Sequence, residues 1–92
     1  MKVYLIKEDN HGLIGVAATH KAAMQWLIAS GWVGRYSEIW LPDENHCDGG
    51  RNMMLGELYG EDWEKQFLRF SYGALEDMGF YLCQEDVIEE ED

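Results

Sequence analysis

The sequence predicts an α+β domain, in which a small antiparallel sheet of about three to four strands carries two to three helices on one face. The chain has 92 residues, which is the size of one domain. Its residues are 47% hydrophobic and 13% aromatic, so the chain is too apolar to be wholly disordered. Strand-like and helical patterns alternate along it without a repeat or a linker. We expect residues 1–88 to form a single α+β domain and residues 89–92 to be an acidic C-terminal tail.

The chain opens with the pattern of a β-hairpin. Residues 2–7 mix β-branched and aromatic side chains between two lysines, as strands do. Residues 8–12 are turn-forming types that end at Gly12, which tolerates a positive φ. Residues 13–18 should therefore return as the second strand.

A helix is predicted next, over residues 20–30. Thr19 is a candidate N-cap, because its hydroxyl can accept a hydrogen bond from a free amide of the first turn. Gly31 stands where glycine commonly follows a helix end. The side chains of one helical face recur at helical spacing: Ala23, Trp26, Leu27 and Ser30.

The middle of the chain is less regular. Residues 32–36 fit no pattern, whereas residues 38–41 have strand character and Pro42 should end that strand. Residues 43–52 are polar and contain two glycines, which predicts a loop. Residues 53–59 fit either a short strand or a helical turn.

The C-terminal part predicts two helices and a last strand. A helix is expected over residues 61–70, with Trp63, Phe67 and Phe70 on one face. Ser71 should cap a second short helix that runs through Met78 and ends at Gly79, and residues 80–84 should form a strand. Trp26, Trp40 and Trp63 fall on periodic apolar positions and are expected in the core.

Negative charge is concentrated after residue 52. The chain holds 18 acidic and 7 basic residues, a net charge of −11. Residues 1–52 contribute six acids and five bases, whereas residues 53–92 contribute twelve acids and only two bases, a net charge of −10. This balance excludes a basic stripe for nucleic acid. An acidic surface serves solubility in many small proteins, but it can also bind a basic protein.

The predicted partner-binding residues are eight acids of the C-terminal part and two aromatic residues that no element explains. The acids on the predicted helices carry the most weight, because a folded element fixes their geometry. Aromatic residues beside charge are typical of protein interfaces. The set is Glu57, Glu61, Asp62, Glu64, Glu76, Asp77, Glu85, Asp86, Trp32 and Tyr36.

No catalytic, metal or cofactor motif is complete, so we predict a protein that is not an enzyme, with no cofactor and no metal. His46, Cys47 and Asp48 are metal-ligand types, but no second pair of ligands follows them. Gly49 and Gly50 lack the Gly-Lys-Ser/Thr of a phosphate loop.

Compartment is predicted from what the N-terminus lacks. The first apolar run is too short for a signal peptide or a membrane span, so the expected compartment is the cytoplasm, with no membrane partner. Cys47 and Cys83 are expected to be reduced thiols there, in a loop and in a strand respectively.

Four segments resemble small uncharacterised proteins of Gram-positive bacteria and their phages: Lys2-Val-Tyr-Leu-Ile6, His11-Gly-Leu-Ile-Gly-Val-Ala17, Gly60-Glu-Asp-Trp-Glu64 and Met78-Gly-Phe80. In size and acidity the chain is also similar to anti-CRISPR proteins, several of which mimic nucleic acid. This similarity does not assign a functional role to any residue of the chain. It implies an inhibitor that binds a basic nucleic-acid-binding effector, such as a Cas nuclease. The alternative is a small adaptor or structural protein of a mobile element, which acts by self-association as a homodimer or by aromatic contacts.

Overall fold

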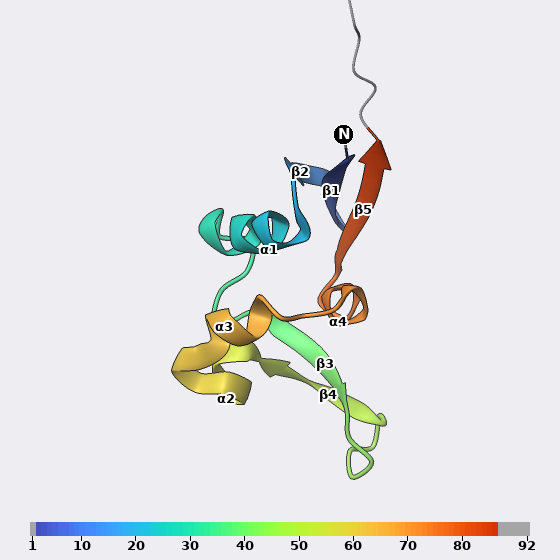
Figure 1. The fold of residues 1–92 in the computed structure, drawn as a ribbon. Coiled ribbons are helices and arrows are strands. Elements are labelled where there is room, and N and C mark those ends of the chain that lie inside the picture. The colour runs from blue at the N-terminus through green and yellow to red at the C-terminus, as the bar shows by residue number, and fades with distance from the viewer. Residues whose placement is uncertain (1, 87–92) are drawn as a thin grey trace, which may run out of the picture.

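A computed structural model describes residues 2–86 of the chain (Figure 1). In chain order the elements are β1 (Lys2–Glu8), β2 (Gly12–Ala17), α1 (His20–Ala29), β3 (Glu38–Pro42), β4 (Gly50–Met54), α2 (Leu55–Tyr59), the 3-10 helix η1 (Gly60–Asp62), α3 (Trp63–Phe67), α4 (Tyr72–Glu76) and β5 (Phe80–Asp86). The α+β class with an antiparallel sheet is therefore confirmed. The predicted tail at 89–92, and residues 87 and 88 before it, lie outside the described residues.

The strands form two antiparallel sheets. β1 is the central strand of the first, between β2 and β5, and β3 pairs with β4 in the second. Leu5 of β1 faces Val16 of β2 on one side and Cys83 of β5 on the other. The sequence predicted the β1–β2 hairpin and β5, whose apolar, β-branched and aromatic residues are typical of strands.

β4 corrects the prediction of a loop over residues 43–52. The loop is shorter, and the amide of Asp43 donates to the carbonyl of Gly49 at 3.0 Å to close it. From Gly50 onward the chain pairs with β3, and Asn52 lies opposite Trp40. Polar residues form this strand because pairing with β3 satisfies the hydrogen bonds of their backbone groups. The local sequence of residues 50–54 contains no pattern that predicts this pairing.

The predicted caps are confirmed. The Thr19 hydroxyl accepts a hydrogen bond from the amide of Ala22 at 3.0 Å, and the Ser71 hydroxyl accepts one from Ala74 at 3.2 Å. Gly31 has a φ of +85°, in the left-handed region where glycine meets no Cβ penalty.

The predicted helix over residues 61–70 is shorter than expected. Residues 60–62 form η1, and α3 ends at Phe67. Beyond it the chain closes a tight turn in which the amide of Phe70 donates to the carbonyl of Phe67 at 2.9 Å. The predicted apolar face is still used, because Phe67 is fully buried and Trp63 and Phe70 pack against the core.

One core joins both sheets and the helices. Its buried residues form a single cluster: Ile6, Ala23, Met24, Leu27, Val33, Ile39, Leu55, Phe67, Leu75 and Phe80. Figure 1 shows α1 beside the three-stranded sheet, and α4 between that sheet and the β3–β4 hairpin. Among residues 2–86, no helix is long and apolar enough to cross a membrane.

Trp40 corrects the prediction that it belongs to the core. Trp26 and Trp63 do pack partly buried against the core, but the Trp40 side chain is 42% exposed. Successive side chains of a strand point to opposite faces. Because Ile39 is the buried residue of β3, Trp40 must lie on the outer face.

Candidate functional site

The eight predicted acidic residues lie in three separate groups. All eight are exposed. Glu76 and Asp77 lie at the C-terminal end of α4, and Glu85 and Asp86 lie at the end of β5. The remaining four belong to α2, η1 and α3, and Figure 1 shows these helices well apart from the end of β5. The structure therefore does not gather all eight into one surface.

The densest group, here called the α2–α3 acidic segment, consists of Glu57, Glu61, Asp62 and Glu64. Each lies in the first turn of its helix, where the positive end of the helix dipole favours an acid. The Glu57 carboxylate also accepts a hydrogen bond from the amide of Met54 at 3.3 Å. Within residues 2–86, no lysine or arginine lies within ion-pair distance of these four carboxylates. Their charge is therefore free to act on a partner.

Tyr36 lies next to Glu57 of this segment. Its side chain is 75% exposed, and the Arg35 guanidinium lies 5.9 Å from the centre of its ring. A hollow of about 200 Å³ is lined by Arg35, Tyr36, Met54, Gly56 and Glu57. Two predicted partner-binding residues, Tyr36 and Glu57, thus meet at one site.

The outer face of the β3–β4 hairpin extends this site. Glu38 lies opposite Met54, which is also part of the hollow. Trp40 follows Glu38 by two residues and therefore points to the same face. We use the name acidic–aromatic surface for Tyr36, Glu38, Trp40 and Met54 together with the α2–α3 acidic segment, which meets them at Glu57.

Sequence reasoning missed the contribution of Trp40 and Glu38. The signal was present in the alternation of β3, because Ile39 and Leu41 can only both face the core if Trp40 does not. Hydrophobicity alone gives no such answer, since all three residues are apolar.

Trp32, which was predicted as a partner-binding residue, is partly buried against the core and lies apart from Tyr36 and Glu57. Its ring packs edge-on against His11 at 5.2 Å and against Phe80 at 6.5 Å between ring centres. The chain is folded back after α1, because the amide of Val33 donates to the carbonyl of Leu27 at 3.0 Å. This turn directs Trp32 toward the three-stranded sheet.

A second hollow, of about 710 Å³, brings the α4 acids near apolar side chains. Ile39, Leu41, Tyr59, Phe70 and Ala74 contribute its apolar wall. Glu76, Asp77 and Arg69 add charge to the lining. The Ser71 hydroxyl in this hollow is engaged as the cap of α4.

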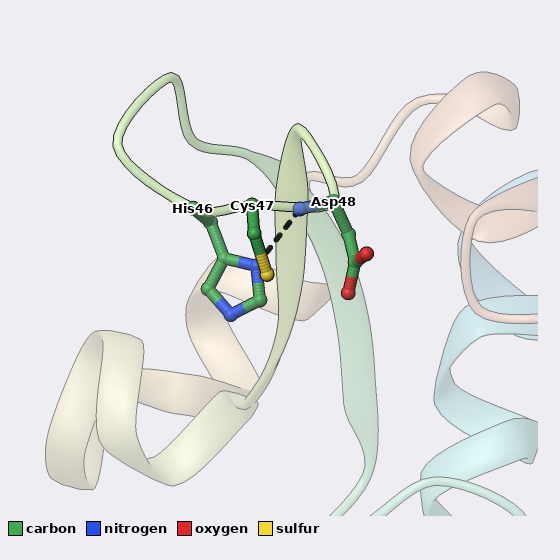
Figure 2. A group of neighbouring side chains, drawn as sticks. All are labelled: His46, Cys47 and Asp48. Carbon is green, nitrogen blue, oxygen red and sulfur yellow. Dashed lines mark hydrogen bonds between the residues drawn. The ribbon is translucent and has the colours of Figure 1, made fainter.

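The loop between β3 and β4 carries a three-residue cluster of metal-ligand types (Figure 2). The ligand atoms of His46, Cys47 and Asp48 lie within 4.8 Å of one another, and all three residues are exposed. His46 Nδ1 accepts a hydrogen bond from the Asp48 amide at 3.5 Å. The cluster offers three ligands, one fewer than a structural zinc site uses. Cys47 and Cys83 are free cysteines, in the loop and in β5.

Three groups with shifted pKa values lie elsewhere. A hydrogen bond from His11 lowers the pKa of Glu8, a hydrogen bond with Tyr4 raises the pKa of Tyr72, and a hydrogen bond to Asp9 raises the pKa of Tyr81. The largest cause of each shift is a hydrogen bond with one neighbouring side chain. None of the three residues belongs to the acidic–aromatic surface.

No protein-family model, curated protein or solved structure matches the chain.

Proposed function

We propose that this protein is an inhibitor that binds a basic, nucleic-acid-binding effector through its acidic–aromatic surface. The effector class suggested by the resemblance is a CRISPR nuclease, acting in the cytoplasm. The observation that carries the proposal is the α2–α3 acidic segment, whose four exposed carboxylates lie without a cationic partner among residues 2–86.

The mechanism is competition for the effector's lysines and arginines. A double-stranded nucleic acid presents one negative charge per about 1.7 Å of its axis. A row of carboxylates on helices offers the same sign at a coarser spacing, and bidentate arginine contacts suit carboxylate as well as phosphate. Association through such charges is fast and salt-sensitive.

The aromatic residues would supply the part of the affinity that salt does not remove. Tyr36 and Trp40 are exposed by 75% and 42%. Tyrosine and tryptophan dominate the binding energy of many protein interfaces, because they bury a large area at a small entropic cost. A partner groove that holds apolar side chains between its cations would fit both features.

A matched pair of charge reversals tests the proposal. Glu61→Lys with Glu64→Lys alters the α2–α3 acidic segment, whereas Glu85→Lys with Asp86→Lys makes the same change of net charge at the end of β5. The assay is displacement of labelled DNA from a panel of basic effectors that includes Cas nucleases. We expect the wild type and the β5 variant to displace DNA and the α2–α3 variant to fail. Equal inhibition by both variants, or no displacement from any effector by the wild type, would overturn the proposal.

The exposed aromatic pair also favours a second candidate, an adaptor that self-associates. Sedimentation of the wild type and of Tyr36→Ser with Trp40→Ser discriminates between the two. A wild-type dimer that becomes monomeric in the variant supports the adaptor, and a wild-type monomer removes it.

A further inference from the structure

Three of the seven basic residues meet in one groove on this acidic protein. Lys21, Lys65, Gln66, Leu68 and Arg69 line a hollow of about 520 Å³. Lys21 comes from α1, whereas the others come from α3 and the residues that follow it. The tertiary fold therefore brings together cations that lie far apart in the sequence.

These three cations form no ion pair with an acid among the described residues. Within residues 2–86, no carboxylate lies within ion-pair distance of Lys21, Lys65 or Arg69. Asp62 precedes Lys65 by three residues, the spacing of a helical ion pair, yet η1 and α3 do not bring the two charges into contact. Arg51, by contrast, lies 3.7 Å from Asp43. Arg69 also lines the larger hollow that contains Glu76 and Asp77, but within residues 2–86 no ion pair joins it to either acid.

Lys21 adds an independent indication, because it lies on the second residue of α1. The first turn of a helix is the positive end of its dipole, where a cation is unfavourable. The first turn of α1 holds no acidic residue that would offset this charge. A residue that is unfavourable for its local structure is typical of a functional position. A bound anion would be stabilised by the same helix end that disfavours the lysine.

We propose that this groove binds a small multivalent oxyanion of the phosphoryl or pyrophosphoryl class. Arg69 can bind two oxygens with its planar guanidinium, whereas the lysines act as point charges. Gln66 can donate a further hydrogen bond through its amide, and Leu68 supplies an apolar wall. The hollow has the size of ordinary small-molecule sites, which span about 300–1,000 Å³. The site lies outside the acidic–aromatic surface and does not depend on the function proposed for it.

The test is a titration of the full chain with pyrophosphate, followed by backbone amide chemical shifts in NMR. We expect saturable shifts at residues around Lys21 and at residues 65–69. Lys21→Gln, Lys65→Gln and Arg69→Gln should each weaken binding by about tenfold, the effect of removing one charge-assisted hydrogen bond. Arg51→Gln removes the same unit of charge from β4 and should leave the affinity unchanged.

Two outcomes would overturn the proposal. Pyrophosphate that causes no saturable shifts in the wild type shows that the groove does not bind the anion. Weakening by Arg51→Gln equal to that by the groove variants shows that only net charge matters. A parallel titration with ATP separates the sources of the group. If ATP binds more tightly than pyrophosphate, the ligand is a nucleotide. If the two bind equally, the ligand is the free anion. Both results support the groove as the binding site.

Discussion

At the scale of single residues, a cluster of hydrogen bonds closes the turn between β1 and β2. The Glu8 carboxylate accepts hydrogen bonds from the ring of His11 and from the amide of Asn10, the latter at 3.0 Å. The His11 contact is the largest cause that lowers the pKa of Glu8 below its ordinary value of 4.5. Gly12 then starts β2 with a φ of +71°, which glycine adopts without strain.

This carboxyl predicts a pH-dependent contribution to stability. A carboxyl whose pKa is lower in the folded than in the unfolded state stabilises the fold above the unfolded pKa, and the contribution disappears as the pH falls through the folded pKa. Glu8→Gln should therefore lower the urea midpoint at pH 7, and its difference from the wild type should be smaller at pH 3. The control is Glu44→Gln in the β3–β4 loop. A Glu8→Gln difference that is the same at both pH values would contradict this prediction.

At the scale of elements, the β3–β4 hairpin depends on a glycine that sequence analysis assigned to a loop. Trp40 packs across Gly50 on the outer face of the hairpin. A Cβ on Gly50 would lie 2.2 Å from the Trp40 ring and 2.6 Å from the carbonyl oxygen of Leu41. The second contact involves backbone, so rotation of the tryptophan alone cannot relieve it.

Gly50→Ala should therefore destabilise the protein. We expect the free energy of unfolding to fall by about 1–3 kcal/mol, the usual cost of overpacking. Gly34→Ala is the matched control, because a Cβ there would meet nothing within 4 Å. Urea unfolding followed by circular dichroism measures both. Equal stability of the two variants would show that the hairpin accommodates a Cβ at position 50 without a loss of stability.

The same hairpin shows why some elements could be predicted and others could not. The helix over residues 20–30 has its cap, its apolar face and its terminal glycine within a short stretch of chain, so local chemistry is sufficient. β4 has no such local signal, because Arg51 and Asn52 have low strand propensity and the strand exists through its pairing with β3.

At the scale of the whole molecule, sequence gave the sign and the location of the charge along the chain but not its arrangement in space. The acids after residue 52 were identified, and the eight proposed as partner-binding are exposed. Their separation into three groups depends on the path of the chain through α4 and β5. The meeting of Lys21 with Arg69 depends on how α1 and α3 pack, which no sequence spacing reveals.

The net charge of −11 predicts that salt stabilises this protein. Like charges repel one another in the compact state, and this repulsion opposes folding. Among residues 2–86 the structure has one ion pair between an arginine or lysine and a carboxylate, Arg51 with Asp43, which offsets little of this repulsion. The screening length falls from about 30 Å at 0.01 M to about 10 Å at 0.1 M salt. Sodium chloride over this range should therefore raise the melting temperature.

The size of the salt effect is checked with a variant of lower charge. A gain of 1 kcal/mol corresponds to about 4–8 °C in a domain of this size, so calorimetry can resolve it. Glu85→Lys with Asp86→Lys changes the net charge from −11 to −7 and should give a smaller increase with salt. A melting temperature that falls with salt would show that attractive pairs outweigh the repulsion. The stabilisation by salt should scale with the net negative charge, because salt screens the repulsion between carboxylates. A melting temperature that rises equally steeply with salt in the variant would therefore show that the salt effect does not arise from the excess of carboxylates.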